Sequence, residues 1–387
     1  MNPGSKSSNG MPCIKSVDCH VVEQRLDRPF TFSQWGYASR TTCLVRISAE
    51  DGSYGWGEGY GPASVIKAGI EYLRPLIVGS NPLIVSSLWQ AMHLRTLDYA
   101  RSGVLTAALS ALDVALWDLK GKLLAQPVHV LLGGTRRNAV RVYATGMYFT
   151  EGAGMETRLA REAEQYLSQG FKAMKMKVGH SPDQDVKNVR AVRSAIGPEV
   201  GLMMDANHAY NRSEARLLSR AVEPFDIGWF EEPLSPEDHA GYAELRQQTD
   251  IPIAGGECEY LVHGFKRLLE AQCVDIAQPD ICAAGGFTEL QRIVALVRAF
   301  HVDLTPHCWG TGIAFAAAVH LASTLDPTPG RLIGSEPLLE MDRTENPLRD
   351  RLTFPRFEVR HGAVAVPDTP GLGIDVDSEL LERFAVR

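Results

Sequence analysis

Three acidic residues recur at equal intervals in the middle of the sequence. Asp205, Glu231 and Glu257 are separated by two steps of 26 residues, and each stands at the end of a short apolar segment. One such step is about the length of a strand and helix repeat, so we expect the three side chains on adjacent strands, facing one centre. Three carboxylates cannot share that centre without a cation, and hard oxygen ligands without Cys or His suit Mg²⁺ better than zinc. The spacing therefore predicts a magnesium site with free positions for water and substrate oxygens.

Two lysines stand in the apolar segment that comes one repeat earlier. Lys175 and Lys177 alternate with Met174 and Met176. Strand side chains alternate with a period of two, so both ammonium groups should lie on the same inward face. Their mutual repulsion and a nearby Mg²⁺ both disfavour the charged form, which predicts a lowered pKa and a lysine able to act as a base near pH 7. The alternative is a lysine pair on an exposed strand face, and the apolar neighbours argue against it.

An acidic residue and a histidine end two later segments. Asp280 can accept a hydrogen bond from His307, which would fix the tautomer of the imidazole and raise its basicity. Taken alone, a histidine in the run Thr-Pro-His-Cys-Trp-Gly is more often a buried structural residue. The charged residues that end the neighbouring segments favour a catalytic dyad instead.

The elements that would position these side chains are short apolar strands alternating with amphipathic helices from residue 140 onward. Eight strands are predicted, at 140–145, 173–178, 201–205, 227–231, 251–257, 275–280, 303–307 and 331–335. Charged residues end the second to the seventh, where the active sites of βα barrels are built. Eight units favour a barrel over an open sheet, and no GxGxxG or GxxxxGK[ST] motif follows any strand, so no nucleotide-binding loop is indicated.

The sequence before the barrel has a different pattern. Residues 13–47 alternate β-branched and polar side chains, Asp51-Gly52 predicts a hairpin turn, and helical periodicity follows at 63–76, 83–91 and 104–124. We expect four parts, listed here in chain order: a disordered tail (1–12), an α+β capping domain (13–135), the barrel (136–350) and a C-terminal segment that returns to the capping domain (351–387).

Composition and charge narrow the classes of partner. The chain has 387 residues, 45% of them hydrophobic and 22% charged, with a formal net charge of -7. It lacks the basic excess that binding a phosphate backbone requires, and it has no apolar run long enough to span a membrane. Its opening residues have no apolar region of the kind found in signal peptides, and its seven scattered cysteines are typical of reduced thiols. We expect a cytoplasmic enzyme for a small molecule, without nucleic acid or membrane partners.

These motifs resemble the enolase superfamily, and within it the mandelate racemase subgroup, from about Ile14 to Ile374. The runs that carry the resemblance are Lys175-Met-Lys177, Met204-Asp-Ala-Asn207, Phe230-Glu-Glu-Pro233, Gly256-Glu257, Gln278-Pro-Asp280 and Pro306-His307. The resemblance implies a modified TIM barrel of (β/α)7β type, with an N-terminal α+β capping domain completed by the C-terminal segment. It also implies one Mg²⁺ per subunit and a homo-oligomer.

The implied chemistry is removal of the proton alpha to a carboxylate or lactone carbonyl, with Mg²⁺ stabilising the resulting enolate. By resemblance, Lys177 and His307 stand on opposite faces of the substrate. Asn207 and Glu340 would contribute to ligand binding or enolate stabilisation, and Glu336 competes with Glu340 for that role. Lys175 would support the site beside Lys177.

Substrate contacts are predicted from position. His208 and Trp309 adjoin the metal and base positions, and Trp35, Tyr37 and Tyr60 stand in capping-domain loops that could close over the barrel mouth. The three capping-domain aromatics could equally be ordinary surface residues.

The second step of the reaction decides its outcome. Reprotonation gives racemisation, whereas expulsion of a β-oxygen gives dehydration or ring opening. Asp280 stands where muconate cycloisomerases and dipeptide epimerases carry a lysine, which argues against both. The runs Asp205-Ala-Asn-His-Ala-Tyr210 and His307-Cys-Trp-Gly-Thr-Gly312 are similar to those of galactarolactone cycloisomerases, which predicts opening of an aldaric acid lactone to a 3-deoxy-2-keto acid.

Four alternatives stay open at this point. Within the same chemistry they are an acid-sugar dehydratase acting on the open-chain aldonate or aldarate, and a racemase or epimerase. A catalytically inactive enolase-like binding protein is disfavoured because every ligand and base is present. A metal-dependent barrel hydrolase would be expected to use histidine ligands, which the carboxylate set lacks.

Overall fold

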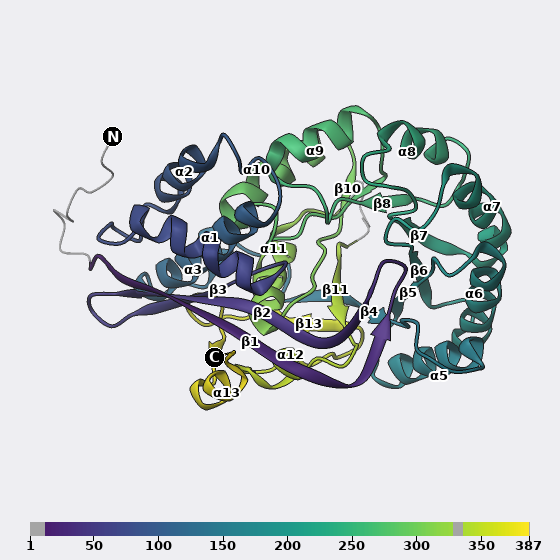
Figure 1. Cartoon of the computed structure of the whole chain (residues 1–387), viewed down its shortest axis with the longest axis horizontal. Helices are drawn as coiled ribbons and strands as arrows, with labels where there is room; N and C mark the ends of the chain where they lie inside the picture. Colours follow the sequence, from purple (N-terminus) through teal and green to yellow (C-terminus); the bar gives the residue numbers. More distant parts are fainter. Residues whose placement is uncertain (1–11, 328–335, 387) are drawn as a thin grey trace.

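The computed structural model describes residues 12–327 and 336–386. The chain begins with an antiparallel sheet of three strands, β1 (Ile14–Thr31), β2 (Gly36–Ala49) and β3 (Tyr54–Gly59). The first two strands form a long hairpin that extends from the capping domain towards the barrel (Figure 1).

Helices cover one face of this sheet. They are α1 (Ala63–Leu73), the 3-10 turn η1 (Arg74–Leu76), α2 (Val85–Thr96), α3 (Val104–Leu123) and α4 (Val128–Leu131). The long helix α3 lies close against β3 because β3 carries Gly55 and Gly57 at the crossing. A Cβ atom on Gly57 would stand 2.0 Å from the carbonyl oxygen of Ala111, so only glycine allows this packing.

The second domain is built from eight parallel strands. They are β4 (Ala139–Gly146), β5 (Ala173–Lys177), β6 (Gly201–Asp205), β7 (Ile227–Glu231), β8 (Ile253–Gly255), β9 (Ile276–Ala277), β10 (Asp303–Leu304) and β11 (Leu338–Asp342). Each strand pairs with its neighbour in the order β10-β9-β8-β7-β6-β5-β4-β11. This is the predicted (β/α)7β order, because a barrel helix follows each of the first seven strands.

The seven helices form the outer layer of the barrel (Figure 1). They are α5 (Met155–Ser168), α6 (Pro182–Ile196), α7 (Arg212–Val222), α8 (His239–Arg246), α9 (Leu261–Glu270), α10 (Gly286–Ala299) and α11 (Gly312–Thr324), with the 3-10 turn η2 (Glu223–Phe225) after α7. Sequence signals set their starts: Ser181 caps α6, and Asn211 and Glu214 form a reciprocal capping box on α7.

The predicted barrel strands agree best in the first half. The third and fourth match β6 and β7 residue for residue, whereas the fifth, sixth and seventh are shorter than predicted. Pro279 and Pro306 explain part of this difference, because proline cannot donate to a strand ladder and stands just beyond β9 and β10. The predicted eighth strand, 331–335, lies outside the described residues, and β11 pairs with β4 at Leu338–Asp342.

The chain then returns to the capping domain. The C-terminal elements are α12 (Pro347–Arg351), β12 (Thr353–Phe354), β13 (Ala363–Ala365), β14 (Asp375–Val376) and α13 (Ser378–Phe384). The backbone N–H of Val386 donates to Val21 on β1 at 2.9 Å, and Trp56 Nε1 on β3 donates to Asp375 at 2.9 Å. The C-terminal segment therefore completes the N-terminal domain, as predicted.

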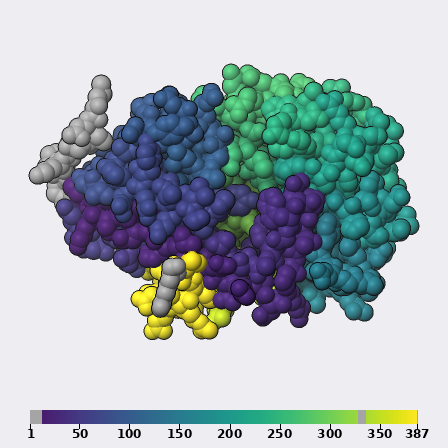
Figure 2. All heavy atoms as spheres, in the orientation of Figure 1, coloured from purple at the N-terminus to yellow at the C-terminus, as the bar shows by residue number. Residues whose placement is uncertain are grey.

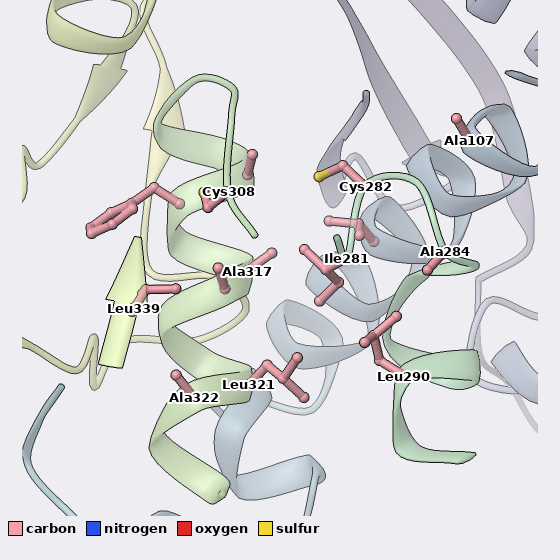
Figure 3. Close-up of a cluster of buried hydrophobic side chains, with 14 of the residues drawn as sticks. Ala107, Ile281, Cys282, Ala284, Leu290, Cys308, Ala317, Leu321, Ala322 and Leu339 are labelled. Carbon is pink, nitrogen blue, oxygen red and sulfur yellow. The ribbon is translucent and has the colours of Figure 1, made fainter. Parts of the chain in front are cut away.

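Helix α11 is buried along almost its whole length because it lies between the two domains. Figure 3 shows Ala317 and Leu321 on this helix between Leu339 of β11 and Ile281 of the loop after β9. Its sequence, Gly-Ile-Ala-Phe-Ala-Ala-Ala-Val, is apolar on all sides, as expected for a helix without a solvent face. Among the residues described, no helix has both the length and the apolar character that a membrane span requires.

Candidate active site

A cavity of about 600 Å³ lies at the carboxyl ends of the barrel strands, under the hairpin of β1 and β2. Figure 2 shows the surface hollowed beside the purple hairpin, with green barrel atoms at the bottom of the hollow. The residues that line the cavity include all six predicted substrate contacts, which are Trp35, Tyr37, Tyr60, Asn207, His208 and Trp309. Its size is in the usual range for a site that binds a small molecule.

The predicted magnesium ligands lie on neighbouring strands. Asp205 at the end of β6 is in register with Glu231 at the end of β7, and Glu257 follows β8 by two residues. Asp205 and Glu231 are fully buried. Trp229 Nε1 and Gln278 Nε2 donate to Glu231 at 2.9 and 2.7 Å, which holds this carboxylate in place.

The electrostatics of these carboxylates favour a bound cation. Burial and the surrounding carboxylates raise the pKa of Glu231 to about 7, although Lys175 opposes this. Burial and Glu232 likewise raise the pKa of Glu257 to about 7. The two lysines therefore do not neutralise the negative charge of these carboxylates. Mg²⁺ prefers hard, negatively charged oxygen ligands of this kind. The residues present fit a magnesium ion.

Two of the three carboxylates contact lysine ammonium groups, and the third, Glu257, lies 3.2 Å from His307 Nε2. Lys177 Nζ contacts Asp205, and Lys175 Nζ contacts Glu231 and lies 3.7 Å from Asp205. In the described part of the chain, the one group of three His, Cys, Asp or Glu residues whose ligand atoms all lie within 4.8 Å is another set: His208, Glu232 and Cys258. A magnesium ion would draw the three carboxylate oxygens together in place of these lysine contacts.

The two lysines share one face of β5, as their spacing predicts, but they lie at different depths. Lys177 lines the cavity, and its Nζ is 2.7 Å from Asn207 Oδ1 and 4.9 Å from the ring centre of Tyr148. Lys175 lies beneath it, does not line the cavity, and is 3.0 Å from Glu340. Lys177 is therefore the lysine that a substrate can reach, and Lys175 fixes the carboxylates.

The loop after β5 is held by one carboxylate. Asp185 Oδ2 on α6 accepts hydrogen bonds from the backbone N–H groups of residues 179–181 at 3.0 to 3.1 Å, and from Tyr210 Oη at 2.6 Å. Since Tyr210 follows β6, Asp185 joins the loops that begin at Lys177 and Asp205.

The predicted lowering of the lysine pKa values is wrong for the protein alone. Burial by itself lowers the pKa of Lys177, but Asp205 outweighs burial and the pKa lies above its ordinary value. The pKa of Lys175 is raised well above its ordinary value, because Glu231 and Glu340 outweigh burial. The repulsion between the lysines is real but smaller than the attraction of the carboxylates. A divalent cation shared by these carboxylates would act in the opposite direction.

The predicted histidine dyad is present. His307 Nδ1 lies 2.7 Å from Asp280 Oδ2, and the two residues form an isolated parallel bridge beyond β9 and β10. His307 Nε2 lies 3.2 Å from Glu257 and lines the cavity. Burial lowers the pKa of His307, but Glu257, Glu340 and Asp280 outweigh it and raise the pKa to about 10.

Glu340, and not Glu336, is the acidic residue that β11 brings to the site. Its carboxylate accepts from Thr145 Oγ1 at 2.6 Å and from the backbone N–H of Cys308 at 3.1 Å. Burial raises the pKa of Glu340, but Lys175 and His307 outweigh it and lower the pKa to about 2. Glu336 is exposed before the strand begins.

The loops beyond β6 and β7 have a strained backbone. Asn207, His208 and Glu232 adopt positive φ values of 41°, 66° and 43°. Such conformations are uncommon for residues other than glycine and cluster at functional sites. Here they turn Asn207 towards Lys177 and His208 into the cavity wall.

The capping domain contributes an aromatic wall, called the roof below and formed by Phe32, Trp35, Tyr37 and Tyr60. The Phe32 ring lies 4.7 Å from Trp35 and 5.9 Å from Tyr37, and the Tyr60 ring lies 5.3 Å from His307. The opposite wall, called the floor, is formed by Lys177, Glu257, His307 and Glu340 of the barrel.

Hydrogen bonds from Ser33 and Gln34 fasten the tip of the hairpin to the barrel. Ser33 Oγ donates to the carbonyl of Ala206 at 2.7 Å, and Gln34 Nε2 donates to the carbonyl of Asn207 at 2.7 Å. Both carbonyls belong to the segment directly after Asp205. The hairpin tip is thus attached next to Asp205, one of the predicted metal ligands.

Two charged residues of the cavity were missed by the sequence reasoning. Arg40 on β2 is buried, stacks on Trp309 at 4.1 Å, and pairs with Asp342 at 2.9 Å. Its Nη1 atom has no hydrogen-bond partner among the described residues. Glu58 on β3 accepts from Thr311 N at 3.0 Å, at the start of α11. A charged residue within the alternating β2 segment was the available signal for Arg40.

Comparisons with known proteins agree with this geometry. Residues 16–133 match the family described as mandelate racemase / muconate lactonizing enzyme, N-terminal domain, and residues 158–380 match the family described as enolase C-terminal domain-like. The chain is 39% identical to D-galactarolactone cycloisomerase of Agrobacterium fabrum over 371 residues, which cover 96% of this chain and 98% of that protein.

Solved structures are also similar. The structure of 3,6-anhydro-D-galactonate cycloisomerase from Zobellia galactanivorans is 52% identical, has a TM-score of 0.89, and covers 97% of this chain and 100% of that one. A racemase from Streptomyces coelicolor with bound magnesium is 29% identical, with a TM-score of 0.86, covering 96% of this chain and 100% of that one.

Proposed function

The chain belongs to the mandelate racemase / muconate lactonizing enzyme family of the enolase superfamily, whose members use Mg²⁺, and from this premise we propose that it is a cycloisomerase of cyclic acid sugars. The proposed reaction opens the ring by β-elimination and yields a 3-deoxy-2-keto acid. The observation that carries the proposal is the pairing of two ionisable groups, Lys177 and His307, across one cavity, in a chain whose relatives at 39% and 52% identity are both named cycloisomerases.

The proposed roles follow from the position of each side chain. Lys177 ends β5 and His307 follows β10, and four strands separate β5 from β10 in the barrel, so the two groups reach a substrate from different sides. Asp205, Glu231 and Glu257 would hold Mg²⁺, which supplies stabilisation of the negative charge that develops on the substrate carboxylate. Asp280 fixes the His307 tautomer through Nδ1.

The proposed reaction balances in protons and electron pairs without a co-reactant. One of Lys177 and His307, in its neutral form, takes the proton from the carbon alpha to the carboxylate. The electron pair of that C–H bond forms the new C=C bond, and the bond from the β-carbon to the ring oxygen breaks. Where the ring is an ether, the other group donates its proton to the leaving alkoxide; where it is a lactone, a carboxylate leaves without one. The enol then becomes the 2-keto acid, and no water is gained or lost.

Two ring substrates fit this scheme. The lactone of an aldaric acid is the substrate that the sequence motifs favour, and the 39% identical relative is named for galactarolactone. A 3,6-anhydro-galactonate is the second candidate, favoured by the more similar structure at 52% identity. Both carry one carboxylate, an adjacent carbon that bears a proton, and a ring oxygen on the next carbon. We place the anhydro acid first in the test because of the higher identity.

Other parts of the proposal rest on the residues that line the cavity. Asn207, His208 and Trp309 on the barrel side, and Trp35, Tyr37 and Tyr60 in the roof, would contact the sugar. Open-chain dehydration and racemisation use the same groups and are separate outcomes of the test. Cytoplasmic location and assembly into a homo-oligomer stay predictions.

The test is proton NMR of the purified protein with Mg²⁺ in D₂O. The panel contains 3,6-anhydro-D-galactonate, its L-isomer, galactaro-1,4-lactone, and open-chain galactonate and galactarate. Formation of a 3-deoxy-2-keto acid from a ring substrate, without reaction of the open acids, supports the proposal. Loss of water from the open acids alone identifies a dehydratase, and alpha-proton exchange without elimination identifies a racemase or epimerase; either result overturns the proposal.

The matched control uses the same substitution at two lysines. Lys177→Met should abolish the reaction, whereas Lys187→Met, at an exposed lysine on α6, should not. Protein treated with a chelator and then restored with Mg²⁺ checks that the activity depends on the metal.

A further inference from the structure

A second group of metal-type ligands lies beside the proposed magnesium site. His208, Glu232 and Cys258 bring one imidazole nitrogen, one carboxylate oxygen and one sulfur within 4.8 Å of one another. They come from the loops after β6, β7 and β8, and Glu232 and Cys258 directly follow Glu231 and Glu257 in the chain. The proposed mechanism uses neither Glu232 nor Cys258.

The hydrogen bonds of His208 determine which of its nitrogens is free. Nδ1 lies 3.0 Å from the carbonyl oxygen of Leu234, which can only accept, so Nδ1 carries a hydrogen. Nε2 lies 3.0 Å from Glu232 Oε2 and 3.5 Å from Cys258 Sγ. In the neutral imidazole, Nε2 would then direct a lone pair at a carboxylate, which is a repulsive contact. A proton or a metal ion between the two atoms would remove this repulsion.

The histidine is also arranged like a metal ligand. Ligating histidines donate their other ring N–H to a backbone carbonyl or a carboxylate, which fixes the ring orientation. The bond from His208 Nδ1 to Leu234 is of that type. The backbone N–H of His208 donates in addition to the carbonyl of Glu232 at 2.7 Å, so the two proposed ligands are held together.

The distances fit a small tetrahedral ion. Zn²⁺ with bonds of about 2.0–2.1 Å to nitrogen and oxygen and about 2.3 Å to sulfur places nitrogen about 3.3 Å from oxygen and about 3.6 Å from sulfur. The observed separations of 3.0 and 3.5 Å differ from these by a few tenths of an ångström. Mg²⁺ avoids thiolate and imidazole, so the mixed donor set would discriminate between the two metals.

The group is accessible to ions from solution. Cys258 is exposed, and His208 and Cys258 both line the cavity, whereas Glu232 is buried beneath them. Three protein ligands leave one tetrahedral position open to water or to a ligand in the cavity.

We propose that His208, Glu232 and Cys258 form a zinc site, separate from the magnesium site and facing the same cavity. Zinc bound there engages His208, which is a proposed substrate contact, so that His208 can no longer bind the sugar. The site is therefore inhibitory: zinc lowers the affinity for the acid sugar while Mg²⁺ stays bound.

The binding test uses full-length protein saturated with Mg²⁺. Equilibrium dialysis against Zn²⁺, followed by metal analysis, should give one zinc per chain with the magnesium content unchanged. Cys258→Ser and His208→Ala should each weaken zinc binding by about 100-fold or more, since each removes one of three ligands. Cys13→Ser, at a half-buried cysteine remote in sequence, is the matched control and should bind as the native protein does.

Cobalt gives a readout that reports the sulfur ligand directly. Co²⁺ added to the Mg²⁺-saturated protein should produce a thiolate charge-transfer band, which Cys258→Ser removes and Cys13→Ser retains. Zinc should also protect Cys258 from a thiol reagent. Three results would overturn the proposal: no zinc binding, displacement of magnesium mole for mole, or zinc binding that is unchanged in Cys258→Ser.

The inhibitory role has a separate test that rests on the proposed function. With a confirmed substrate and excess Mg²⁺, zinc should raise KM for the native protein and for Cys13→Ser but not for Cys258→Ser. If no substrate on the panel reacts, the proposed function fails while the dialysis and cobalt results still decide the site. Zinc binding without a change in KM overturns the inhibitory role.

Discussion

The floor of the cavity consists of charged side chains at or near the carboxyl ends of barrel strands, whereas its roof consists of aromatic rings from the hairpin of β1 and β2 and of Tyr60 directly after β3. Each charge of the floor has partners at short range, as with His307 and Asp280 at 2.7 Å. In the roof, Trp35 is 61% exposed, and its ring packs against the edge of Phe32. The floor is fixed before a substrate arrives, and the roof has room to adapt. Chemistry and selectivity should therefore respond to different substitutions.

The largest effect should come from the floor. Lys177→Met and His307→Asn each remove a group that we propose moves a proton, and we expect kcat to fall by about 10²- to 10⁴-fold. The measurement is turnover of the substrate identified by NMR, with circular dichroism to check the fold. His361→Asn, at an exposed histidine, is the control. Turnover near the native value in both floor variants would contradict the assignment of the chemistry to the floor.

A substitution at the junction of roof and floor should act on KM. Arg40→Met removes a guanidinium that lines the cavity, and with it the donor that we expect a sugar oxygen to meet. A hydrogen bond to a charged group contributes about 1.5–3 kcal/mol, so KM should rise by about 10- to 100-fold with a smaller change in kcat. Steady-state kinetics would measure both. Equal loss of kcat and kcat/KM, with KM unchanged, would show instead that Arg40 acts in the chemical step, as the floor residues do.

Glu58 tests how strongly the two regions are joined. Its carboxylate accepts from Thr42 Oγ1 at 2.8 Å and from the backbone of residues 311 and 314 at 3.0 to 3.2 Å, so it ties the capping sheet to the start of α11. Glu58→Gln replaces one acceptor oxygen by a donor that faces these N–H groups. We expect the free energy of unfolding to fall by about 1–3 kcal/mol in urea titrations. An unchanged unfolding midpoint would show that the hydrogen bonds of Glu58 do not contribute to stability.

The last of these effects is one of pH on stability, away from both the floor and the roof. Asp113 on α3 is buried against α10, where it accepts from Thr288 N at 2.9 Å, and burial raises its pKa to about 7. A carboxyl with a raised folded-state pKa stabilises the fold most below its unfolded pKa, near 4, and loses that contribution as pH rises through about 7. The loss is at most about 4 kcal/mol.

Asp113→Asn should remove this pH dependence. Its stability relative to the native protein should increase between pH 5 and pH 8, measured as the difference in urea midpoints at each pH. A constant difference across that range would mean that Asp113 stays ionised in the fold.

The sequence predicted the floor better than the roof for a physical reason. Strands β5 to β7 have strong apolar periodicity, and each ends in a charged residue, so Lys177, Asp205 and Glu231 could be placed in register from spacing alone. Arg40 and Glu58 act across the domain boundary, on barrel elements some 250 to 300 residues away, and no local pattern encodes such a contact. The lysine pKa direction was missed because it depends on how many carboxylates surround each ammonium group, which spacing does not give.

The attachment of the hairpin tip has a consequence for rate. Ser33 and Gln34 bond to the carbonyls of residues 206 and 207, so a movement of the hairpin tip that widens the mouth of the cavity would break these bonds beside Asp205, a predicted metal ligand. Opening of such a gate can be slower than the chemical step. Turnover should then decrease in viscous solvents, and Ser33→Ala should speed product escape while it loosens the geometry that the next substrate needs. The hydrogen bonds that order the proposed catalytic groups would then also limit the rate of turnover.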